Sequence, residues 1–154
     1  MSTDERPKQF LSIISEKSML RETAERVLPL VSWENLYVVA VKGMEEKIKE
    51  HLPELPEENL ILEPFGRNTA ACVLYSIAII RRKKGEVVTA FLPADHYIRK
   101  EDRFREVLGA AFKIAQEKVI TFGIPPEFPE TGYGYIKFDK SKPFQIDSIK
   151  YYPA

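Results

Sequence analysis

The feature that most constrains this chain is a repeated alternation of short apolar runs with amphipathic helical patterns. Residues 36–41 form a continuous apolar run rich in β-formers, and residues 59–63 and 87–92 are further stretches in which apolar residues dominate. Such runs are typical of strands that are covered on both faces, as in a parallel sheet. Because helical patterns separate the runs, the sequence predicts an α/β fold with a mainly parallel sheet.

Two helices are predicted around the first run. Apolar residues recur at helical spacing over residues 20–31, with Ser18 as a plausible N-cap. Pro29 should weaken or end the last turn of this helix because it clashes with the preceding turn. A short helix over residues 44–52 should follow the first strand and stop at Pro53.

The rest of the chain continues the pattern, and we expect residues 1–154 to form one domain. Helices are predicted over residues 69–84 and 104–115. The first of these helices should turn one apolar set inward: Ala71, Leu74, Tyr75, Ala78 and Ile79. Further strands, the last two rich in aromatic residues, are predicted over residues 8–14, 119–122, 133–138 and 144–152.

Composition excludes some functions. Lysine plus arginine and aspartate plus glutamate balance at 23 each, which argues against a protein that grips nucleic acid by its backbone. Nucleotide binding remains open because it needs only local positive groups and N–H donors. The polar start and the lack of a run of about 20 apolar residues predict no membrane span. The single cysteine, Cys72, favours a reducing cytoplasm.

The segment 63–69 joins a predicted strand to a predicted helix. Gly66 permits close backbone approach, and Asn68 or Thr69 can cap the helix. The free N–H groups of the helix N-terminus favour an anion or the polar edge of a base. The alternative is an ordinary strand–turn–helix connection, since turn chemistry also explains each residue.

Asp95 follows the run at 87–92. A carboxylate there can hold Mg²⁺ against triphosphate oxygens, although Mg²⁺ usually takes one or two carboxylates together with phosphate and water. The alternative is that Asp95 caps the next turn and that His96 is a surface imidazole.

Two further segments carry polar groups. Glu130 and Thr131 can hydrogen-bond sugar hydroxyls, and the glycines Gly132 and Gly134 suggest a bulge or close passage of a ligand. The alternative is a glycine-relieved bend whose tyrosines pack on a sheet edge. Lys8 can neutralise a phosphate, or it can be a solvated lysine.

In this order, the four segments jointly resemble bacterial mannose-1-phosphate guanylyltransferases. The matching stretches are Arg6-Pro-Lys-Gln-Phe-Leu11, Leu62-Glu-Pro-Phe-Gly-Arg-Asn-Thr-Ala70, Leu92-Pro-Ala-Asp-His-Tyr-Ile98, and Thr121-Phe-Gly-Ile-Pro125 followed by Pro129-Glu-Thr-Gly-Tyr-Gly-Tyr-Ile136.

The resemblance implies a Rossmann-like nucleotidyltransferase domain that makes GDP-mannose and pyrophosphate from GTP and mannose 1-phosphate, with Mg²⁺ as cofactor. It also implies that Lys8 neutralises phosphate and that Asp95 binds the metal. The residues that would bind the nucleotide are Glu63, Pro64, Gly66, Asn68 and Thr69. Those that would bind mannose are Glu130, Gly132 and Tyr133. Lys8 and Asp95 would be the catalytic residues. Because residues 63–69, Asp95 and residues 130–133 follow predicted strand ends, we expect them to converge on one cleft edge.

The chain also departs from the family pattern. The family carries a strand and a glycine-rich loop before the Pro-Lys-Gln-Phe segment, but here Met1 stands only a few residues upstream. Tyr151-Tyr152 stands where the family has Glu-Lys. We therefore expect a domain without the family's first strand and C-terminal region, with poor turnover on its own. Without the first strand, the sheet would have an unpaired edge that can pair with a second copy of the chain, so a homo-oligomer is possible. The alternatives are an inactive remnant that binds nucleotide or a partner, and a related nucleotidyltransferase for another base or sugar.

Overall fold

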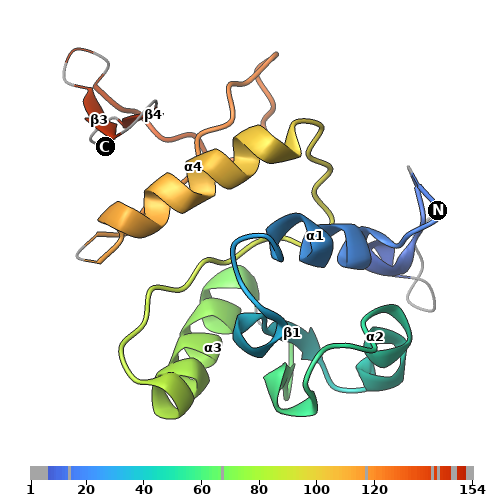
Figure 1. Cartoon of the computed structure of the whole chain (residues 1–154). Helices are drawn as coiled ribbons and strands as arrows, with labels where there is room; N and C mark the ends of the chain where they lie inside the picture. Colours follow the sequence, from blue (N-terminus) through green and yellow to red (C-terminus); the bar gives the residue numbers. More distant parts are fainter. Residues whose placement is uncertain are drawn as a thin grey trace. The chain divides into compact units, whose positions relative to one another are not determined.

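A computed structural model describes residues 7–13, 15–66, 68–116, 118–139, 141, 143–146 and 149–151 (Figure 1). The chain divides into two compact units, residues 1–101 and residues 102–154, and each is described by itself. The expectation of a single domain over residues 1–154 stays a prediction.

The first long helix of the first unit is α1, Met19–Val27. The predicted N-cap is confirmed, because the Ser18 hydroxyl accepts a hydrogen bond of 3.2 Å from the Arg21 amide. The helix ends at Val27 with Leu28 as its C-cap, immediately before Pro29. Proline therefore stops this helix earlier than the apolar pattern alone suggests, as expected for a residue that cannot continue the hydrogen-bond ladder.

A parallel strand pair forms the centre of the first unit. Strand β1, Val38–Val41, and strand β2, Leu60–Glu63, run side by side, with Val41 opposite Glu63 in the register. Helix α2, Glu45–His51, forms the connection between them. This strand–helix–strand unit confirms the predicted α/β class.

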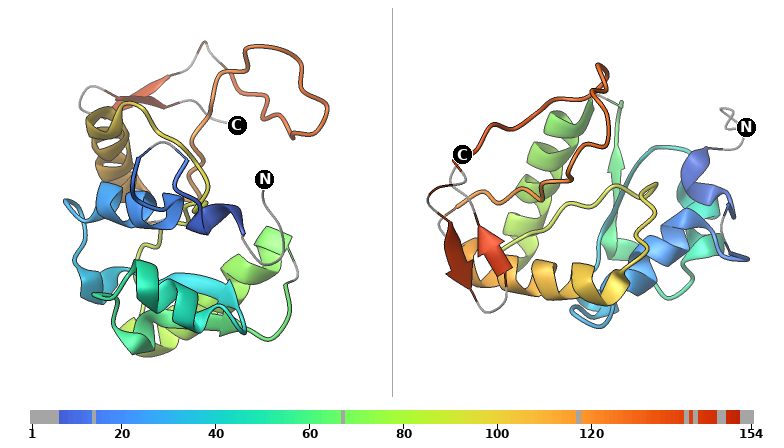
Figure 2. Two further views of the ribbon diagram at one scale, coloured as in Figure 1. Left: turned by 90° about the vertical axis from the view of Figure 1, so that its right-hand side faces the viewer. Right: turned by 90° about the horizontal axis from the view of Figure 1, so that it is seen from above.

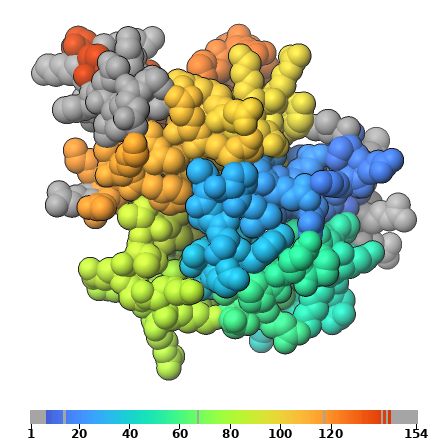
Figure 3. Space-filling model, viewed as in Figure 1, coloured from blue at the N-terminus to red at the C-terminus, as the bar shows by residue number. Residues whose placement is uncertain are grey.

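The core of this unit lies on one face of the β1–β2 sheet. Its buried centre comes from α1 and from α2 with its C-cap: Leu20, Ala24, Ile48 and Leu52. Val38, Ala40 and Leu60 pack against it from the sheet. The space-filling view shows the blue atoms of α1 directly against the green atoms of the α2 region (Figure 3).

Helix α3, Asn68–Lys84, packs against β2, on the side of the sheet away from α2 (Figures 1 and 2). Its bounds confirm the predicted helix, but its predicted inward face is wrong at Leu74, Tyr75 and Ala78, whereas Ala71 and Ile79 are half-buried. Leu74 is 69% exposed and Tyr75 is exposed too, whereas Ser76 and Ile80 are buried. This helix is apolar nearly all round, so the sequence pattern does not select a face.

Two short 3₁₀ helices contact each other through the hydrogen bonds of one asparagine side chain. They are η2, Trp33–Asn35, and η3, Glu57–Asn59. The buried amide of Asn59 donates hydrogen bonds to the carbonyls of Trp33 at 3.1 Å and Leu36 at 3.0 Å. These bonds hold the segment that leads into β1 beside the segment that leads into β2.

The predicted strand over residues 8–14 is wrong. Residues Lys8–Phe10 form a 3₁₀ helix, η1, with a hydrogen bond of 3.0 Å from the Leu11 amide to the Lys8 carbonyl. Pro7 precedes it with φ of −59°, a value that suits a tight turn. Ile14 lies outside the described residues.

The predicted strands at residues 87–92, 119–122 and 133–138 are also wrong. In the described part of the chain these stretches pair with no strand, and their apolar side chains are largely exposed, with Val119 at 95%. A strand needs the backbone of a neighbour for its hydrogen bonds. A run of β-forming residues favours the extended conformation, but it does not provide the neighbouring strand that pairing requires.

The second unit holds most of helix α4, Glu101–Ile114, whose first residue is the last of the first unit. This helix confirms the prediction over residues 104–115, and Leu108 and Ala111 are buried on it. The predicted strand over residues 144–152 is two strands, β3, Phe144–Ile146, and β4, Ile149–Tyr151, paired antiparallel. Within the described residues, no helix has the length and apolar character to cross a membrane.

Candidate functional site

The carboxyl edge of the β1–β2 sheet carries the segment 63–69. Because the strands are parallel, both end at this edge, and the Lys42 amide donates a hydrogen bond of 3.3 Å to the Glu63 carbonyl. A Cβ added at Gly66 would lie 3.5 Å from Cγ1 of Val41, which is an ordinary contact. The segment therefore passes over the end of β1, and the chain's own packing does not require glycine there.

The start of α3 has an unusual backbone conformation. Asn68 has φ of +65°, and it is the one non-glycine residue with positive φ in the described part of the chain. Asparagine tolerates this left-handed region better than most residues, yet such conformations cost about 1–3 kcal/mol and cluster at ligand sites. Asn68 is the first residue of α3, where a helical residue ordinarily has φ of about −60°. Pro64, Gly66, Asn68 and Thr69 are all exposed to solvent.

Glu63 faces the first turns of α3 through its carboxylate. Burial raises the pKa of the Cys72 thiol, and the nearby negative charge of Glu63 raises it further, against a lowering contribution from Ser76. The Ser76 hydroxyl donates a hydrogen bond of 2.6 Å to the Cys72 carbonyl. The thiol therefore stays protonated near neutral pH, which is the opposite of what a nucleophilic cysteine needs.

Asp95 lies in a turn whose neighbouring residues contact the core and the side chain of Arg26. The turn places Ala94 against the core and leaves the side chains of Asp95 and His96 exposed. A guanidinium nitrogen of Arg26 donates a hydrogen bond of 3.3 Å to the carbonyl of His96. The residue therefore sits on an anchored loop and does not follow a strand at 87–92, as the sequence had suggested.

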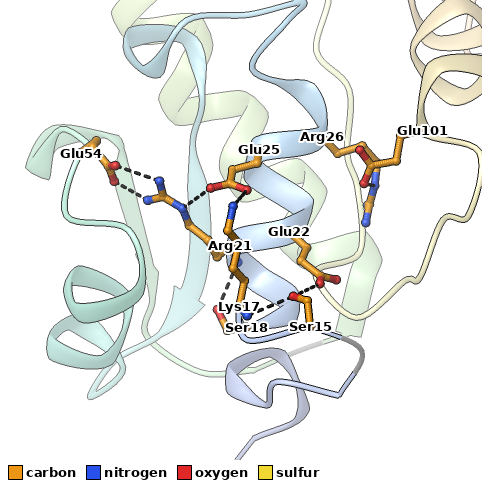
Figure 4. Close-up of polar contacts among 9 residues, drawn as sticks. All are labelled: Ser15, Lys17, Ser18, Arg21, Glu22, Glu25, Arg26, Glu54 and Glu101. Atoms are coloured by element: carbon orange, nitrogen blue, oxygen red, sulfur yellow. Dashed lines mark hydrogen bonds and ion pairs between the residues drawn. The ribbon is translucent and has the colours of Figure 1, made fainter.

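Arg26 is a residue that sequence reasoning missed. It is only 3% exposed, and its Nε lies 3.3 Å from Oε1 of Glu101 (Figure 4). A second contact of 3.5 Å joins its guanidinium to the Thr23 hydroxyl. The available signal was its spacing, because a residue three positions after Thr23 lies on the apolar side of α1, where an arginine is unexpected.

Lys8 shares the core that supports Asp95. Its side chain is exposed, and Phe10, in the same 3₁₀ turn, packs against the cluster that also supports Ala94 and Ala40. The segments of the two predicted catalytic residues are thus both attached to one hydrophobic cluster.

Glu130, Gly132 and Tyr133 lie in the second unit, in a loop held by its own side chains. The Tyr135 hydroxyl accepts from the Glu130 amide at 2.8 Å and donates to the Glu130 carbonyl at 2.9 Å. The Gly132 amide donates to Oε1 of Glu130 at 3.0 Å. Tyr133 is exposed. The convergence of this loop with residues 63–69 and Asp95 stays a prediction.

The turn after β1 was not among the expected site loops. Gly43 has φ of +94°, and its amide donates a hydrogen bond of 2.6 Å to Oε2 of Glu45. Lys42 is exposed beside it, at the same carboxyl edge as Glu63. A glycine two residues after an apolar run was the sequence signal for this turn.

The donor set fits a metal that arrives with its substrate. Among the residues that the structure describes, no group of three or more His, Cys, Asp or Glu side chains could hold a metal ion by itself. Asp95 offers a single exposed carboxylate. Mg²⁺ often takes only one or two carboxylates and completes its octahedron with phosphate oxygens and water.

The chain is similar in sequence to known nucleotidyl transferases. Residues 2–152 match the family Nucleotidyl transferase. The chain is 41% identical over 141 residues to a mannose-1-phosphate guanylyltransferase of Salmonella muenchen, covering 88% of this chain. It is 39% identical over 140 residues, 89% of this chain, to the xanthan biosynthesis protein XanB of Xanthomonas campestris pv. campestris (strain ATCC 33913). The chain spans about 30% of the length of either relative.

A solved structure shows the same fold. The crystal structure of mannose-1-phosphate geranyltransferase from Thermus thermophilus matches with a TM-score of 0.68 and 34% identity, over 75% of this chain and 33% of that chain. The resemblance drawn from the four sequence segments is thereby confirmed. The chain belongs to the nucleotidyl transferase family and within it is similar to the mannose-1-phosphate guanylyltransferases.

Proposed function

We propose that this chain contributes to guanylyl transfer from GTP to mannose 1-phosphate. A phosphate oxygen of the sugar phosphate attacks the α-phosphorus of GTP, a new P–O bond forms, and the bond to the β-phosphate breaks with release of pyrophosphate. The observation that carries the proposal is the 41% identity to a mannose-1-phosphate guanylyltransferase over 88% of the chain.

The segment 63–69 is the proposed nucleotide site. It crosses the carboxyl edge of a parallel sheet, the usual location of ligands in such folds. The N–H groups at the start of α3 offer donors to an anion or to the edge of guanine, and Gly66 leaves room for close approach of the backbone. Glu63, Pro64, Asn68 and Thr69 would shape this pocket.

Lys8 and Asp95 are the proposed catalytic residues. Lys8 would lie against the phosphates and lower the repulsion that the attacking oxygen meets. Asp95 would hold Mg²⁺, which when bound neutralises charge on the triphosphate. Transfer of this kind depends on alignment and on charge neutralisation more than on a covalent nucleophile, so two exposed groups on one anchored core suit it.

The loop around residue 130 is the proposed sugar site. Glu130 would accept hydrogen bonds from mannose hydroxyls, Gly132 would let the sugar approach the backbone, and Tyr133 would stack on the sugar face. The exposed ring of Tyr133 is available for such a contact.

The proposed location is the cytoplasm. The protein has a single cysteine, Cys72, which suits a reducing compartment.

Nucleotide binding tests the proposal directly. We expect the chain to bind GTP in a magnesium-dependent manner by calorimetry, and Asp95→Asn to weaken that binding about tenfold, because an amide is a poorer ligand than a carboxylate. Asp102→Asn is the matched control, since Asp102 is a fully exposed aspartate outside the loop. Equal affinity of the chain and Asp95→Asn would remove Asp95 from the site.

Product analysis tests the reaction class. Incubation with GTP, mannose 1-phosphate and Mg²⁺ should yield GDP-mannose and pyrophosphate in equal amounts, at the low rate expected for this chain on its own. ATP and UTP should compete poorly with GTP in the binding assay. Tighter binding of another nucleotide would indicate a related nucleotidyltransferase for a different base, and binding without product would indicate a nucleotide-binding role.

A further inference from the structure

The loop that carries Asp95 is attached to a buried arginine of α1. Arg26 is 3% exposed, and its guanidinium donates to the His96 carbonyl at 3.3 Å. His96 directly follows Asp95 in the chain. The bond therefore fixes the backbone at His96, one residue after the residue that carries the carboxylate.

The same guanidinium is held by two further groups. Its Nε lies 3.3 Å from Oε1 of Glu101 (Figure 4). One terminal nitrogen lies 3.5 Å from the Thr23 hydroxyl. Thr23 belongs to α1, so the arginine is oriented from its own helix and from residues 70 and 75 positions later. A buried charge is costly unless it is paired and hydrogen-bonded, and these contacts offset the cost of burying the guanidinium.

Arginine suits this place better than lysine does. Its planar fork presents donors to a carbonyl and to a carboxylate at once, whereas lysine offers a single point charge. Ala94, which directly precedes Asp95 in the chain, packs against the hydrophobic core. The backbone around Asp95 is therefore fixed on both sides while the carboxylate itself stays exposed.

We propose that Arg26 is a positioning residue, which fixes the turn at residues 94–97 so that the Asp95 carboxylate is presented in one orientation. The link to metal and nucleotide rests on the function proposed above, whereas the fixing of the turn does not. Residues that orient a ligand to a metal typically change affinity by about 10–100-fold when they are altered.

The first test measures the turn without any ligand. In ¹⁵N relaxation experiments on the full chain, we expect backbone order parameters at residues 94–97 near 0.85, falling toward about 0.6 in Arg26→Met. Arg21→Met is the matched control, because Arg21 lies on the same helix and pairs with Glu25 and Glu54 instead. Unchanged order in Arg26→Met, or an equal loss in Arg21→Met, would overturn the proposal.

The second test asks whether Arg26 acts through Asp95. Calorimetry with GTP and Mg²⁺ should show about a tenfold loss of affinity in Arg26→Met, and no further loss when the change is made in the Asp95→Asn background. Equal losses in both backgrounds would overturn the link to Asp95. Arg26→Lys, which keeps the charge, should restore little of the affinity and serves if Arg26→Met does not fold.

The two proposals fail differently. If the unaltered chain shows no magnesium-dependent binding of GTP, the proposed function is wrong, and the order parameters still decide whether Arg26 positions the turn. If the chain binds GTP and the turn stays ordered in both Arg26 variants, the proposed function stands and the role of Arg26 is wrong.

Discussion

The Asp95 turn and the Glu130 loop differ in how they are held. The Asp95 turn is fixed by contacts with residues about 70 positions away, through Arg26, and by the packing of Ala94 on the core. The Glu130 loop is fixed by bonds within five residues, between Glu130 and Tyr135 and between Glu130 and Gly132. The conformation of the first loop thus depends on the folded core, and that of the second depends on local sequence.

The largest expected effect comes from the core beneath the Asp95 turn. Leu52→Ala should lower the free energy of unfolding by about 3 kcal/mol, because Leu52 is almost fully buried and its loss leaves a cavity. The order of residues 94–97 should fall with it, since Ala94 packs on the same cluster.

Urea unfolding followed by circular dichroism measures this cost. The control is Val119→Ala, at an exposed position in the second unit, with an expected change below about 0.5 kcal/mol. Similar losses for both variants would contradict the contrast between a core-dependent and a locally held region.

A smaller effect concerns the ion pairs of α1. Arg21 donates to Glu54 at 2.5 and 2.9 Å and to Glu25 at 2.8 Å (Figure 4). Its guanidinium lies 5.7 Å from the centre of the Trp33 ring. Arg21→Met should cost on the order of 1 kcal/mol at neutral pH. Unlike Arg26→Met, it should leave the Asp95 turn ordered.

The ion pairs also predict a pH dependence. The hydrogen bond from Arg21 lowers the pKa of Glu54. Burial alone would raise the pKa of Glu25, but hydrogen bonds from Lys17 and Arg21 outweigh it and lower that pKa as well. A folded-state pKa below the unfolded value of about 4.3 adds stability above that pH, and this stability is lost as pH falls through the folded pKa.

Arg21→Met should therefore weaken this acid sensitivity. The measurement is the free energy of urea unfolding at pH 6 and at pH 3, for the chain and for the variant. A variant that loses as much stability on acidification as the unaltered chain would show that other carboxylates control the acid response.

The smallest effect concerns the local loop. Tyr135→Phe removes the hydroxyl that joins the Glu130 amide and carbonyl, and because this group is exposed we expect a loss below about 1 kcal/mol in overall stability. Order parameters at residues 130–134 should fall, and those at residues 94–97 should not change. A drop in stability comparable to that of Leu52→Ala would show that the loop is not held locally.

The elements that could be predicted are those that local chemistry decides. The α1 stripe, its Ser18 cap and its end before Pro29 follow from spacing and from two residue types. The parallel β1–β2 pair followed from two apolar runs separated by one short helix. The position of residues 63–69 at a strand end and a helix start was predictable for the same reason.

The elements that could not be predicted depend on distant partners. The runs at residues 87–92 and 119–122 have strong β-preference, but strand pairing requires a neighbour that sequence pattern does not specify. The buried face of α3 was missed because most of its faces are apolar. Arg26 was missed because its partners, His96 and Glu101, lie 70 and 75 residues further on.

The anchoring of the Asp95 turn has a consequence for the order in which the chain folds. The bond from Asn59 to Leu36 closes a loop of 23 residues, and the bond from Arg26 to His96 closes one of 70. By the logarithmic dependence of loop closure on length, the longer loop costs about 1 kcal/mol more in chain entropy. During synthesis, the β1–β2 pair can therefore form while residues beyond 63 are still being added. The turn that presents Asp95 is fixed only after the chain has reached Glu101.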